Sequence, residues 1–366
     1  MTEKTAKSGK TVFVGLSGGV DSAVAAALLQ EQGYTVVGAF MKNWSDTKDP
    51  VTGGCAWRRE KHDAERVAVR LGIPFVVFDF EKEYREAVVG YMVREYAAGR
   101  TPNPDVLCNR DIKFDLFMGE ARRLGADMIA TGHYCRTERS QTGEYRLLAG
   151  LDRNKDQSYF LNQITQRQLS RVLFPIGHFR KPKVRELARK FGLPVAEKKD
   201  SQGICFIGKV KLGDFLGQRI ESRSGTVIDV RGREVGKHSG LVHYTVGQRH
   251  GLGMAGGPWF VVDKDLKNNR LIVAQARDEK KALYSKSLAF GPVHWIAGHP
   301  PILPLKCRAR IRYRQPLQAV TVTRKGERGS WVAEFVRKQR AMTPGQFIVF
   351  YDGENCLGGG VIRNRL

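Results

Sequence analysis

The sequence has no apolar run long enough to cross a lipid bilayer. The longest obvious one, residues 23–29, falls well short of the roughly 18–20 residues that a membrane-spanning helix needs. The first ten residues are polar and contain neither an apolar signal region nor an Arg-rich amphipathic stretch. We therefore expect a cytoplasmic protein that has no membrane partner.

Cysteine is also scarce. The six cysteines are widely separated and no two of them form a CxxC pair, which argues against a zinc ribbon and against a disulfide framework. Each is expected to be a reduced, buried thiol unless its surroundings indicate otherwise. No role is assigned to Cys55, Cys135, Cys307 or Cys356.

Acidic residues are too few to balance the basic ones. The 366-residue chain has 61 Lys and Arg against 37 Asp and Glu, so its formal charge is +24. Repulsion among so many cations is tolerated best beside a polyanion, and nucleic acid is the first partner to consider. With 42% hydrophobic residues, a chain of this length can build two or three domains.

The first half of the chain alternates β-branched runs with longer helical stretches. Strands are predicted over residues 11–16, 34–41, 75–80 and 127–131, and helices over 22–32, 57–71, 81–98, 111–124 and 184–191. This alternation predicts an open, doubly wound α/β domain with a parallel sheet. Ligands bind such sheets beyond the carboxyl ends of the strands, here the loops 17–21, 42–54 and 132–134.

Helical periodicity fades after about residue 222, and short alternating stretches take over. Residues 225–230, 259–263 and 270–274 predict a small β-rich domain, and 306–312, 318–323, 331–335 and 346–351 predict an antiparallel β-barrel. The domain boundaries expected from these changes are 1–221, 222–284 and 285–366.

The strongest short motif, GLSGGVDS, lies between the first predicted strand and the first predicted helix. Its adjacent glycines allow close backbone approach to an anion, and a helix N-terminus supplies N–H donors. It is neither a Walker loop nor a GxGxxG fingerprint. The alternative is a tight turn in which Asp21 and Ser22 cap the helix. Residues 251–256, GLGMAG, do fit GxGxxG, but the run that follows is β-like, so dinucleotide binding is not expected there.

Two cysteines have unusual surroundings. Cys108 ends the run PNPDVLC, three residues after Asp105, in a loop that two prolines stiffen and that opens onto a helix; a thiol near a helix N-terminus ionises more readily. Cys205 lies in the Gly-flanked run SQGICFIG, between the α/β and β-rich regions. Local spacing alone fits a structural role for each thiol better than a catalytic one.

The GLSGGVDS string resembles the pyrophosphate-loop signature, SGGxDS, of ATP pyrophosphatases. Six further segments narrow the resemblance: FMKNW at 40–44, NPD at 103–105 with Cys108, ATGHY at 130–134, KDQSYF at 155–160, SQGICFI at 201–207 and YTVGQR at 244–249. Together, and in this order from about residue 11 to the C-terminus, they resemble the bacterial tRNA-specific 2-thiouridylases.

The resemblance implies an adenine nucleotide alpha hydrolase-like N-terminal domain and an ATP-dependent 2-thiolation of the wobble uridine in tRNA. Uridine O2 would be adenylated, and sulfur would come from a persulfide on Cys205, with Cys108 releasing it and forming a disulfide with Cys205, and Asp105 acting as acid and base. The implied ATP-binding residues are Gly15, Leu16, Ser17, Gly18, Gly19, Val20, Asp21, Ser22, Met41 and Gly132. The implied tRNA-binding residues are Asn103, Pro104, Asp105, His133, Lys155, Asp156, Gln157, Arg312, Tyr313 and Gln346.

The resemblance also implies partners. These are Mg²⁺ with the triphosphate, the tRNAs for Lys, Glu and Gln, and a cysteine desulfurase or a sulfur-relay protein. No dedicated metal site is visible in the sequence beyond Asp21 as a weak candidate. Two alternatives stay open: a pyrophosphate-loop ligase acting on a small molecule, and an RNA-binding protein that uses ATP only as a conformational ligand.

Two basic clusters fit an RNA partner. Cations at every second position from 306 to 314 would line one face of a regular strand, with Tyr313 on the other face; they are Lys306, Arg308, Arg310, Arg312 and Arg314. A second candidate patch lies near the start of the predicted helix 184–191 and consists of Lys181, Lys183, Arg185 and Arg189.

Overall fold

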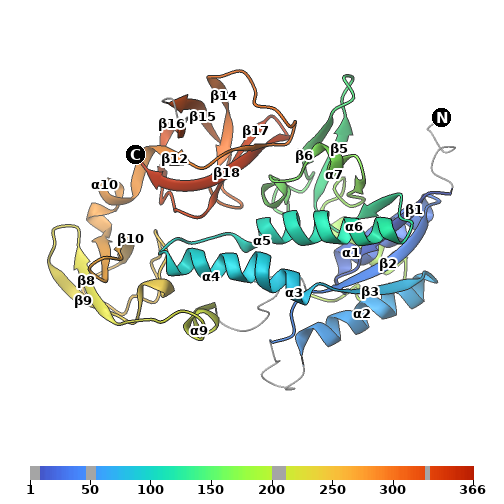
Figure 1. Ribbon diagram of the computed structural model, residues 1–366, viewed down its shortest axis with the longest axis horizontal. Helices are drawn as coiled ribbons and strands as arrows, with labels where there is room; N and C mark the ends of the chain where they lie inside the picture. The colour runs from blue at the N-terminus through green and yellow to red at the C-terminus, as the bar shows by residue number, and fades with distance from the viewer. Residues whose placement is uncertain (1–8, 47–54, 200–211, 326–329) are drawn as a thin grey trace.

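The computed structural model describes residues 9–46, 55–199, 212–325 and 330–366. They form a five-stranded sheet, a four-stranded sheet and a nine-stranded sheet, which occupy successive parts of the chain with one exception noted below (Figure 1). In the parts of the chain so described, no helix combines the length and hydrophobicity needed to cross a membrane.

The first sheet is entirely parallel. Its strands are β1 (Thr11–Gly15), β2 (Thr35–Lys42), β3 (Phe75–Asp79), β4 (Met128–Ala130) and β7 (Val172–Leu173). The spatial order is β3-β2-β1-β4-β7, with β1 between β2 and β4. Central strands buried on both faces need continuous apolar runs, which is why VFV in β1 is buried throughout.

Helices cover both faces of this sheet, as the doubly wound prediction requires. On one face, α1 (Val20–Glu31), α2 (Ala56–Leu71) and α8 (Lys181–Lys190) share a core with Val12 and Val14. On the other face, Phe13 packs against two long helical runs. These runs are α3 (Glu81–Tyr84), η1 (Arg85–Val89) and α4 (Gly90–Ala97), then α5 (Pro104–Leu107), η2 (Cys108–Leu116) and α6 (Phe117–Arg123).

The second of these runs begins earlier than the predicted helix 111–124. Pro104 occupies the first turn, where its fixed φ and missing N–H are tolerated, so the helix starts there. From Cys108 to Leu116 the turns are π-helical, a conformation that is rare and concentrated at functional sites. Similarly, α8 begins at Lys181 rather than 184, with Pro182 in its first turn.

The predicted β-rich middle region is a four-stranded sheet. Its strands are β8 (Gly225–Asp229), β9 (Glu234–His238), β10 (Trp259–Asp265) and β11 (Arg270–Gln275), in the order β10-β11-β8-β9. Val227, Val261 and Val273 form its core. The GLGMAG segment leads into β10 and not into a helix, which confirms that it lacks the setting of a dinucleotide site.

The C-terminal region closes into a six-stranded antiparallel barrel, as predicted. Its strands are β12 (Tyr284–Phe290), β14 (Leu305–Arg310), β15 (Gln318–Lys325), β16 (Ser330–Arg340), β17 (Phe347–Asp352) and β18 (Asn355–Arg365). Closure follows because β12 pairs with both β16 and β18. Val322, Phe335 and Phe350 fill the interior.

One hairpin crosses the expected domain boundary. Strands β5 (Cys135–Arg139) and β6 (Tyr145–Ala149) follow the parallel strand β4, yet β6 pairs with β18 through Asn355 and Cys356. The barrel sheet therefore continues into the N-terminal region (Figure 1). No sequence pattern indicated this pairing, because a hairpin carries no mark of the edge that it joins.

The expectation of five cations in line along one strand is wrong. Strand β14 ends at Arg310, and Arg310 is buried while Lys306 and Arg308 are exposed. The chain then turns, with the Gln315 side chain accepting a hydrogen bond from the Ile311 N–H and with a positive φ of 63° at Arg314. The alternation that predicts one charged face requires a strand that does not continue this far.

The second basic cluster is not one surface patch either. Lys181 is buried, and Arg185 donates to the carbonyl oxygens of Ala196 and Lys198. Lys183 and Arg189 are exposed and pair with nearby glutamates. The earlier start of α8 explains the difference, because it places Lys181 in the first turn and against the first sheet's loops.

Candidate active site

The phosphate-loop motif forms the turn between β1 and α1. Gly18 has φ of 71°, and a Cβ there would lie 2.3 Å from the Glu60 carbonyl oxygen, so only glycine fits. Gly19 is the N-cap residue of the twelve-residue helix α1, and it has no side chain that could cap the helix. The N-terminus of α1 therefore faces the loop without a side-chain cap at this position. This geometry is that of an anion-binding turn.

Two serines stabilise the turn. The Ser17 N–H donates to Ser22 Oγ over 3.1 Å, and that hydroxyl donates in turn to the Gly19 carbonyl oxygen, also over 3.1 Å. Ser22 is buried, whereas Ser17 is exposed at the mouth of the turn. The motif therefore holds its own conformation, with Ser17 on the accessible side. Leu16 and Val20 are buried in the core beside it and support the turn from behind.

Two lysines bind residues of this turn, and sequence reasoning did not predict either of them in this role. Lys181 Nζ donates to both carboxylate oxygens of Asp21, over 2.8 and 3.0 Å. Lys198 Nζ donates to the Gly18 carbonyl oxygen over 2.9 Å and to Asp63 over 2.7 Å. Both lie more than 150 positions from the motif, so only the tertiary fold brings them to it.

The two further residues predicted to border the nucleotide lie beside the same turn. A Cβ on Gly132 would be 2.6 Å from the Ser22 backbone nitrogen. A Cβ on Gly15 would be 3.0 Å from Met41 Cε, at the carboxyl end of β2. The structure thus brings together the ten predicted nucleotide-site residues at the carboxyl ends of β1, β2 and β4.

Cys108 lies at the start of the π-helical segment, one turn after Asp105. Cys108 is buried at 2% exposure, and Asp105 is half-buried in the first turn of α5. The neighbouring Asn109 is equally buried; its amide Nδ2 donates to the Phe160 carbonyl oxygen over 3.2 Å, and its Oδ1 has no hydrogen-bond partner among the described residues. Asn109 was not among the predicted site residues. The one feature of the sequence that could have indicated it is its position directly after Cys108.

His133 connects this helical run to the nucleotide turn. It follows Gly132, and its ring lies 5.8 Å from that of Phe114 and 6.2 Å from that of Phe174. Thr131 bonds to Nδ1 over 2.7 Å. Burial, together with the positive charge of Lys113, holds the pKa of His133 well below its ordinary value. In this structure His133 is an uncharged packing residue, and its contact with tRNA stays a prediction.

The KDQ segment is only partly accessible. Lys155 is half-buried, whereas Asp156 is 3% exposed and forms an ion pair with Arg310 over 3.3 Å. Gln157 exchanges two hydrogen bonds with the Tyr134 backbone, of 3.0 and 3.1 Å. The structure therefore uses Asp156 and Gln157 to join parts of the chain, and any direct contact with tRNA stays a prediction.

Two of the three barrel residues predicted to bind tRNA, Gln346 and Tyr313, contact segments beside Cys108, and the third, Arg312, does not. Gln346 Nε2 donates to the carbonyl oxygens of Thr101 and Pro102, just before Asn103. The Tyr313 ring lies 4.5 Å from that of Phe160. Arg312 Nη2 donates to the carbonyl oxygens of Val246 and Ala341 and to Thr343, and therefore links the barrel to the middle domain.

The remaining cysteines and the other residues predicted to surround the base differ in their burial and in whether the structure describes them. Asn103 is half-buried and Pro104 is buried at the start of α5. Cys205, with the segment 200–208, lies outside the described residues. Burial raises the pKa of Cys307 and of Cys356 to about 12 and also raises that of Cys135 well above its ordinary value, so these three thiols stay protonated. This fits the absence of an assigned role for them.

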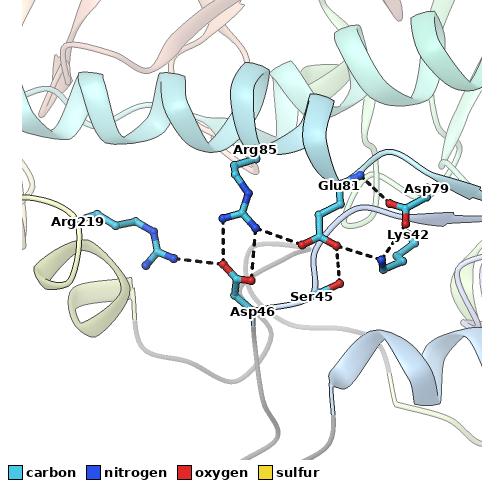
Figure 2. Close-up of polar contacts among 7 residues, drawn as sticks. All are labelled: Lys42, Ser45, Asp46, Asp79, Glu81, Arg85 and Arg219. Atoms are coloured by element: carbon cyan, nitrogen blue, oxygen red, sulfur yellow. Dashed lines mark hydrogen bonds and ion pairs between the residues drawn. The ribbon is translucent and has the colours of Figure 1, made fainter.

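A polar network that was not predicted lies at the carboxyl ends of β2 and β3 (Figure 2). Lys42 Nζ contacts Asp79 over 2.8 Å and Glu81 over 3.1 Å, and the Ser45 hydroxyl donates to Glu81 over 2.6 Å. This bond from Ser45 is the main reason why the pKa of Glu81 is lowered. The segment after β2 is thereby fixed to α3.

The same network continues to Arg219, two residues after the end of α9 (Leu212–Gly217). Arg85 binds Asp46 through two guanidinium nitrogens, and Arg219 lies 3.8 Å from the same carboxylate. Both guanidinium groups also lie over the Trp44 ring, at 4.6 and 5.8 Å. Trp44 belongs to the FMKNW segment, so one residue of that segment packs against both arginines.

Comparison with known proteins agrees with these features. Residues 10–209 match the family model of the tRNA methyl transferase HUP domain, 213–275 that of the tRNA methyl transferase PRC-barrel domain and 285–362 that of the aminomethyltransferase beta-barrel domain. A tRNA-specific 2-thiouridylase, MnmA 2 of Geobacillus kaustophilus, is 51% identical over 96% of this chain and 94% of its own. The chain belongs to the tRNA-specific 2-thiouridylase family.

Another 2-thiouridylase family member, MnmA of Streptococcus sanguinis, is 50% identical over 96% of this chain and 94% of its own. Among solved structures, a 4-thiouridine synthetase–RNA complex with bound ATP matches 58% of this chain and 50% of that chain, with a TM-score of 0.38 and 17% identity. A match of that size adds nothing to the assignment, which depends on the 2-thiouridylase sequences.

Within the described parts of the chain, no group of three or more His, Cys, Asp or Glu is arranged to hold a metal ion. Asp21, the weak candidate from the sequence, has its carboxylate bound by Lys181 and by the Tyr134 hydroxyl.

Proposed function

We propose that this protein is an ATP-dependent tRNA uridine 2-sulfurtransferase that thiolates the wobble uridine. The observation that carries the proposal is the 51% identity to a 2-thiouridylase over nearly the whole chain, with every motif in its place. The anion-binding turn and the helical run of Cys108 meet through the Gly132-His133 loop, which supports a single site for both.

The nucleotide half of the site supplies activation. The turn from Ser17 to Gly19 and the N-terminus of α1 bind the phosphates, and Lys181 and Lys198 add positive charge beside them. Uridine O2 attacks the α-phosphorus, the bond to the β-phosphate oxygen breaks, and pyrophosphate leaves. The resulting AMP ester turns a poor leaving group into a good one. Mg²⁺ accompanies the triphosphate and neutralises part of its charge.

The sulfur half of the site uses two cysteines. The terminal sulfur of a Cys205 persulfide attacks uridine C2, and AMP leaves. The Cys108 thiolate then attacks Cys205 Sγ, breaking the S–S bond to the transferred sulfur; this releases 2-thiouridine and forms a Cys108–Cys205 disulfide. A thiol reductant restores the two cysteines, and a cysteine desulfurase or a relay protein reloads Cys205. Asp105 accepts the N3 proton when O2 is adenylated and returns it to N3 when 2-thiouridine is released.

The remaining assignments follow the same proposal. Asn103, Pro104 and Asp105 surround the extruded base, because a base is modified only outside the stack. Gln346 and Tyr313 lie near the same region, and they are proposed to contact the RNA together with Lys155 and Gln157. The tRNAs for Lys, Glu and Gln as acceptors, and a cytoplasmic location, stay predictions.

The test is sulfur incorporation into purified unmodified tRNA with ATP, Mg²⁺ and either a desulfurase and cysteine or free sulfide. The wild type is compared with Cys108→Ala and Cys205→Ser, and with Cys307→Ser as a matched control at a thiol that has no assigned role. Digested nucleosides are resolved by mass. We expect 2-thiouridine to form only with ATP. Desulfurase-driven thiolation should be lost in the first two variants and retained in the Cys307→Ser control.

The other outcomes identify the alternatives. Pyrophosphate release without thiouridine means that adenylation occurs on a different substrate, as in a small-molecule ligase. ATP and tRNA binding with no pyrophosphate release, and indifference to loss of Cys108 and Cys205, means that the protein is an RNA-binding protein with ATP as a conformational ligand. Either result overturns the proposed function.

A further inference from the structure

Asp156 and Arg310 form a buried ion pair between the two largest domains. Asp156 follows the β6 hairpin of the N-terminal region, and Arg310 ends strand β14 of the barrel. Their side chains are 3% and 10% exposed, and Arg310 Nη2 lies 3.3 Å from Asp156 Oδ2. Neither charge reaches the surface, so neither is placed to contact a polyanion outside.

The carboxylate of the pair is fully bonded, whereas Arg310 Nε is buried without a hydrogen-bond partner among the described residues. Asp156 Oδ1 accepts backbone hydrogen bonds from Gly150 and Ser158, over 3.2 and 3.1 Å. The Arg310 guanidinium lies 4.8 Å from the Tyr351 ring centre, and the Tyr351 hydroxyl is 3.1 Å from Ser158 Oγ. One carboxylate thus fixes the turn 150–158 internally with one oxygen and holds the barrel with the other.

The next residue continues the connection to the nucleotide turn. Gln157 exchanges two backbone-directed hydrogen bonds with Tyr134, and the Tyr134 hydroxyl donates to Asp21 over 2.8 Å. A continuous series of bonds therefore runs from the barrel through Arg310, Asp156, Gln157 and Tyr134 to Asp21. It joins the barrel, whose Tyr313 and Gln346 are proposed to contact RNA, to the proposed ATP site.

We propose that Asp156 is a positioning residue. Together with Arg310, it fixes the barrel on the N-terminal domain so that one tRNA contacts the barrel while its target uridine lies in the proposed active site. It acts through Arg310 and not by touching RNA. The resemblance of KDQ to a tRNA-binding segment implies a contact for Asp156, and the burial of its carboxylate favours this indirect role instead.

The test is a double-mutant cycle on tRNA binding in the full chain. The variants are Asp156→Asn, Arg310→Met and the two combined, and purified unmodified tRNA is titrated at several salt concentrations. Each single variant leaves one buried charge unpaired and is expected to weaken binding about tenfold or more, with the salt dependence unchanged. The double variant is expected to bind more tightly than either single one, because it leaves no buried charge alone.

Lys155→Met is the matched control next to Asp156. If Lys155 contacts phosphate, its replacement lowers the slope of log affinity against log salt by about 1, a change that a positioning residue does not produce. Additive losses in the cycle would mean that Asp156 and Arg310 act independently, and a change of salt slope in Asp156→Asn would mean a direct contact with RNA. Either result would overturn the inference.

Folding does not confound the result. If Asp156→Asn fails to fold while the double variant folds, the pair is shown directly. If neither folds, Tyr351→Phe removes the hydroxyl that bonds to Ser158 and Cys356 and is expected to weaken tRNA binding several-fold at unchanged slope. No effect of Tyr351→Phe would then count against the inference. The inference depends on the proposed function for its RNA readout. A wild type that binds no tRNA refutes that function, while non-additive shifts in the unfolding temperature still test the pair.

Discussion

The Tyr134 hydroxyl donates a 2.8 Å hydrogen bond to Asp21 Oδ1, beside the Lys181 ammonium group that binds the same carboxylate. Tyr134 is buried and comes from the loop after β4, whereas Asp21 is in the first turn of α1. The bond therefore holds the two neighbouring loops of the nucleotide site at a fixed separation.

Tyr134→Phe should weaken ATP binding while leaving tRNA affinity unchanged. A hydrogen bond to a charged group contributes about 1.5–3 kcal/mol, so the expected loss of ATP affinity is about tenfold or more. The measurement is the ATP dissociation constant by calorimetry, with tRNA binding as the second readout. Equal losses in both affinities would indicate a general disturbance of the fold.

Lys181→Met should lower ATP affinity more than Lys183→Met. Lys181 is buried and bonded to Asp21, whereas Lys183, two residues along the same helix, is exposed and pairs with Glu186. Removing Lys181 takes positive charge from the phosphates and leaves Asp21 to repel them, so we expect at least a tenfold loss, against less than twofold for Lys183. Similar losses in the two variants would exclude a local role for Lys181.

Gly132→Ala should abolish nucleotide binding by steric means. The added Cβ would lie 2.6 Å from the Ser22 nitrogen and 2.7 Å from the Asp21 carbonyl carbon, so the loop and the start of α1 must separate. Gly119→Ala in helix α6 is the control, since nothing lies within 4 Å of its Cβ position and alanine favours a helix. Wild-type ATP affinity in Gly132→Ala would show that the two loops are not in contact in solution.

Asn109→Ala should slow sulfur transfer and spare ATP binding. It removes the bond that ties the Cys108 helix to the Phe160 carbonyl oxygen and creates a small cavity in the buried core. We expect kcat for thiolation to fall about tenfold or more and the unfolding free energy to fall by about 1–3 kcal/mol. Single-turnover thiolation, with ATP affinity measured in parallel, checks this; a reduced ATP affinity at unchanged kcat would contradict it.

Stability should fall as the pH drops below the ordinary pKa of histidine. The folded protein holds the pKa of His133 well below that value, mainly by burial, so the unfolded chain takes up the proton first. The contribution is fully present above pH of about 6.5 and is lost progressively as the pH falls below it. Urea unfolding between about pH 8 and pH 5 should show a smaller loss in His133→Gln than in the wild type. An identical pH dependence in both proteins would show that the fold does not keep His133 from taking up a proton.

The sequence by itself determined the kinds of elements and the chemistry of the turn. Period-two and period-3.6 patterns place the strands and helices of the first domain, because each reflects burial of one face of a local element. The phosphate turn was also predictable, since its glycines, serines and helix start are contiguous. The order of motifs likewise indicated the 2-thiouridylase family before any contact was visible.

The tertiary structure alone decided which distant residues meet. Lys181 and Lys198 reach the nucleotide turn, and β6 joins the barrel, through contacts between positions far apart in the chain that no local pattern records. Arg310 also shows that local patterns do not determine tertiary contacts. The alternation of charges predicts that Arg310 lies on a charged strand face, but β14 ends at this residue and its side chain pairs with the buried Asp156 of another domain. Local periodicity describes one element, whereas the environment of a charge depends on every element packed around it.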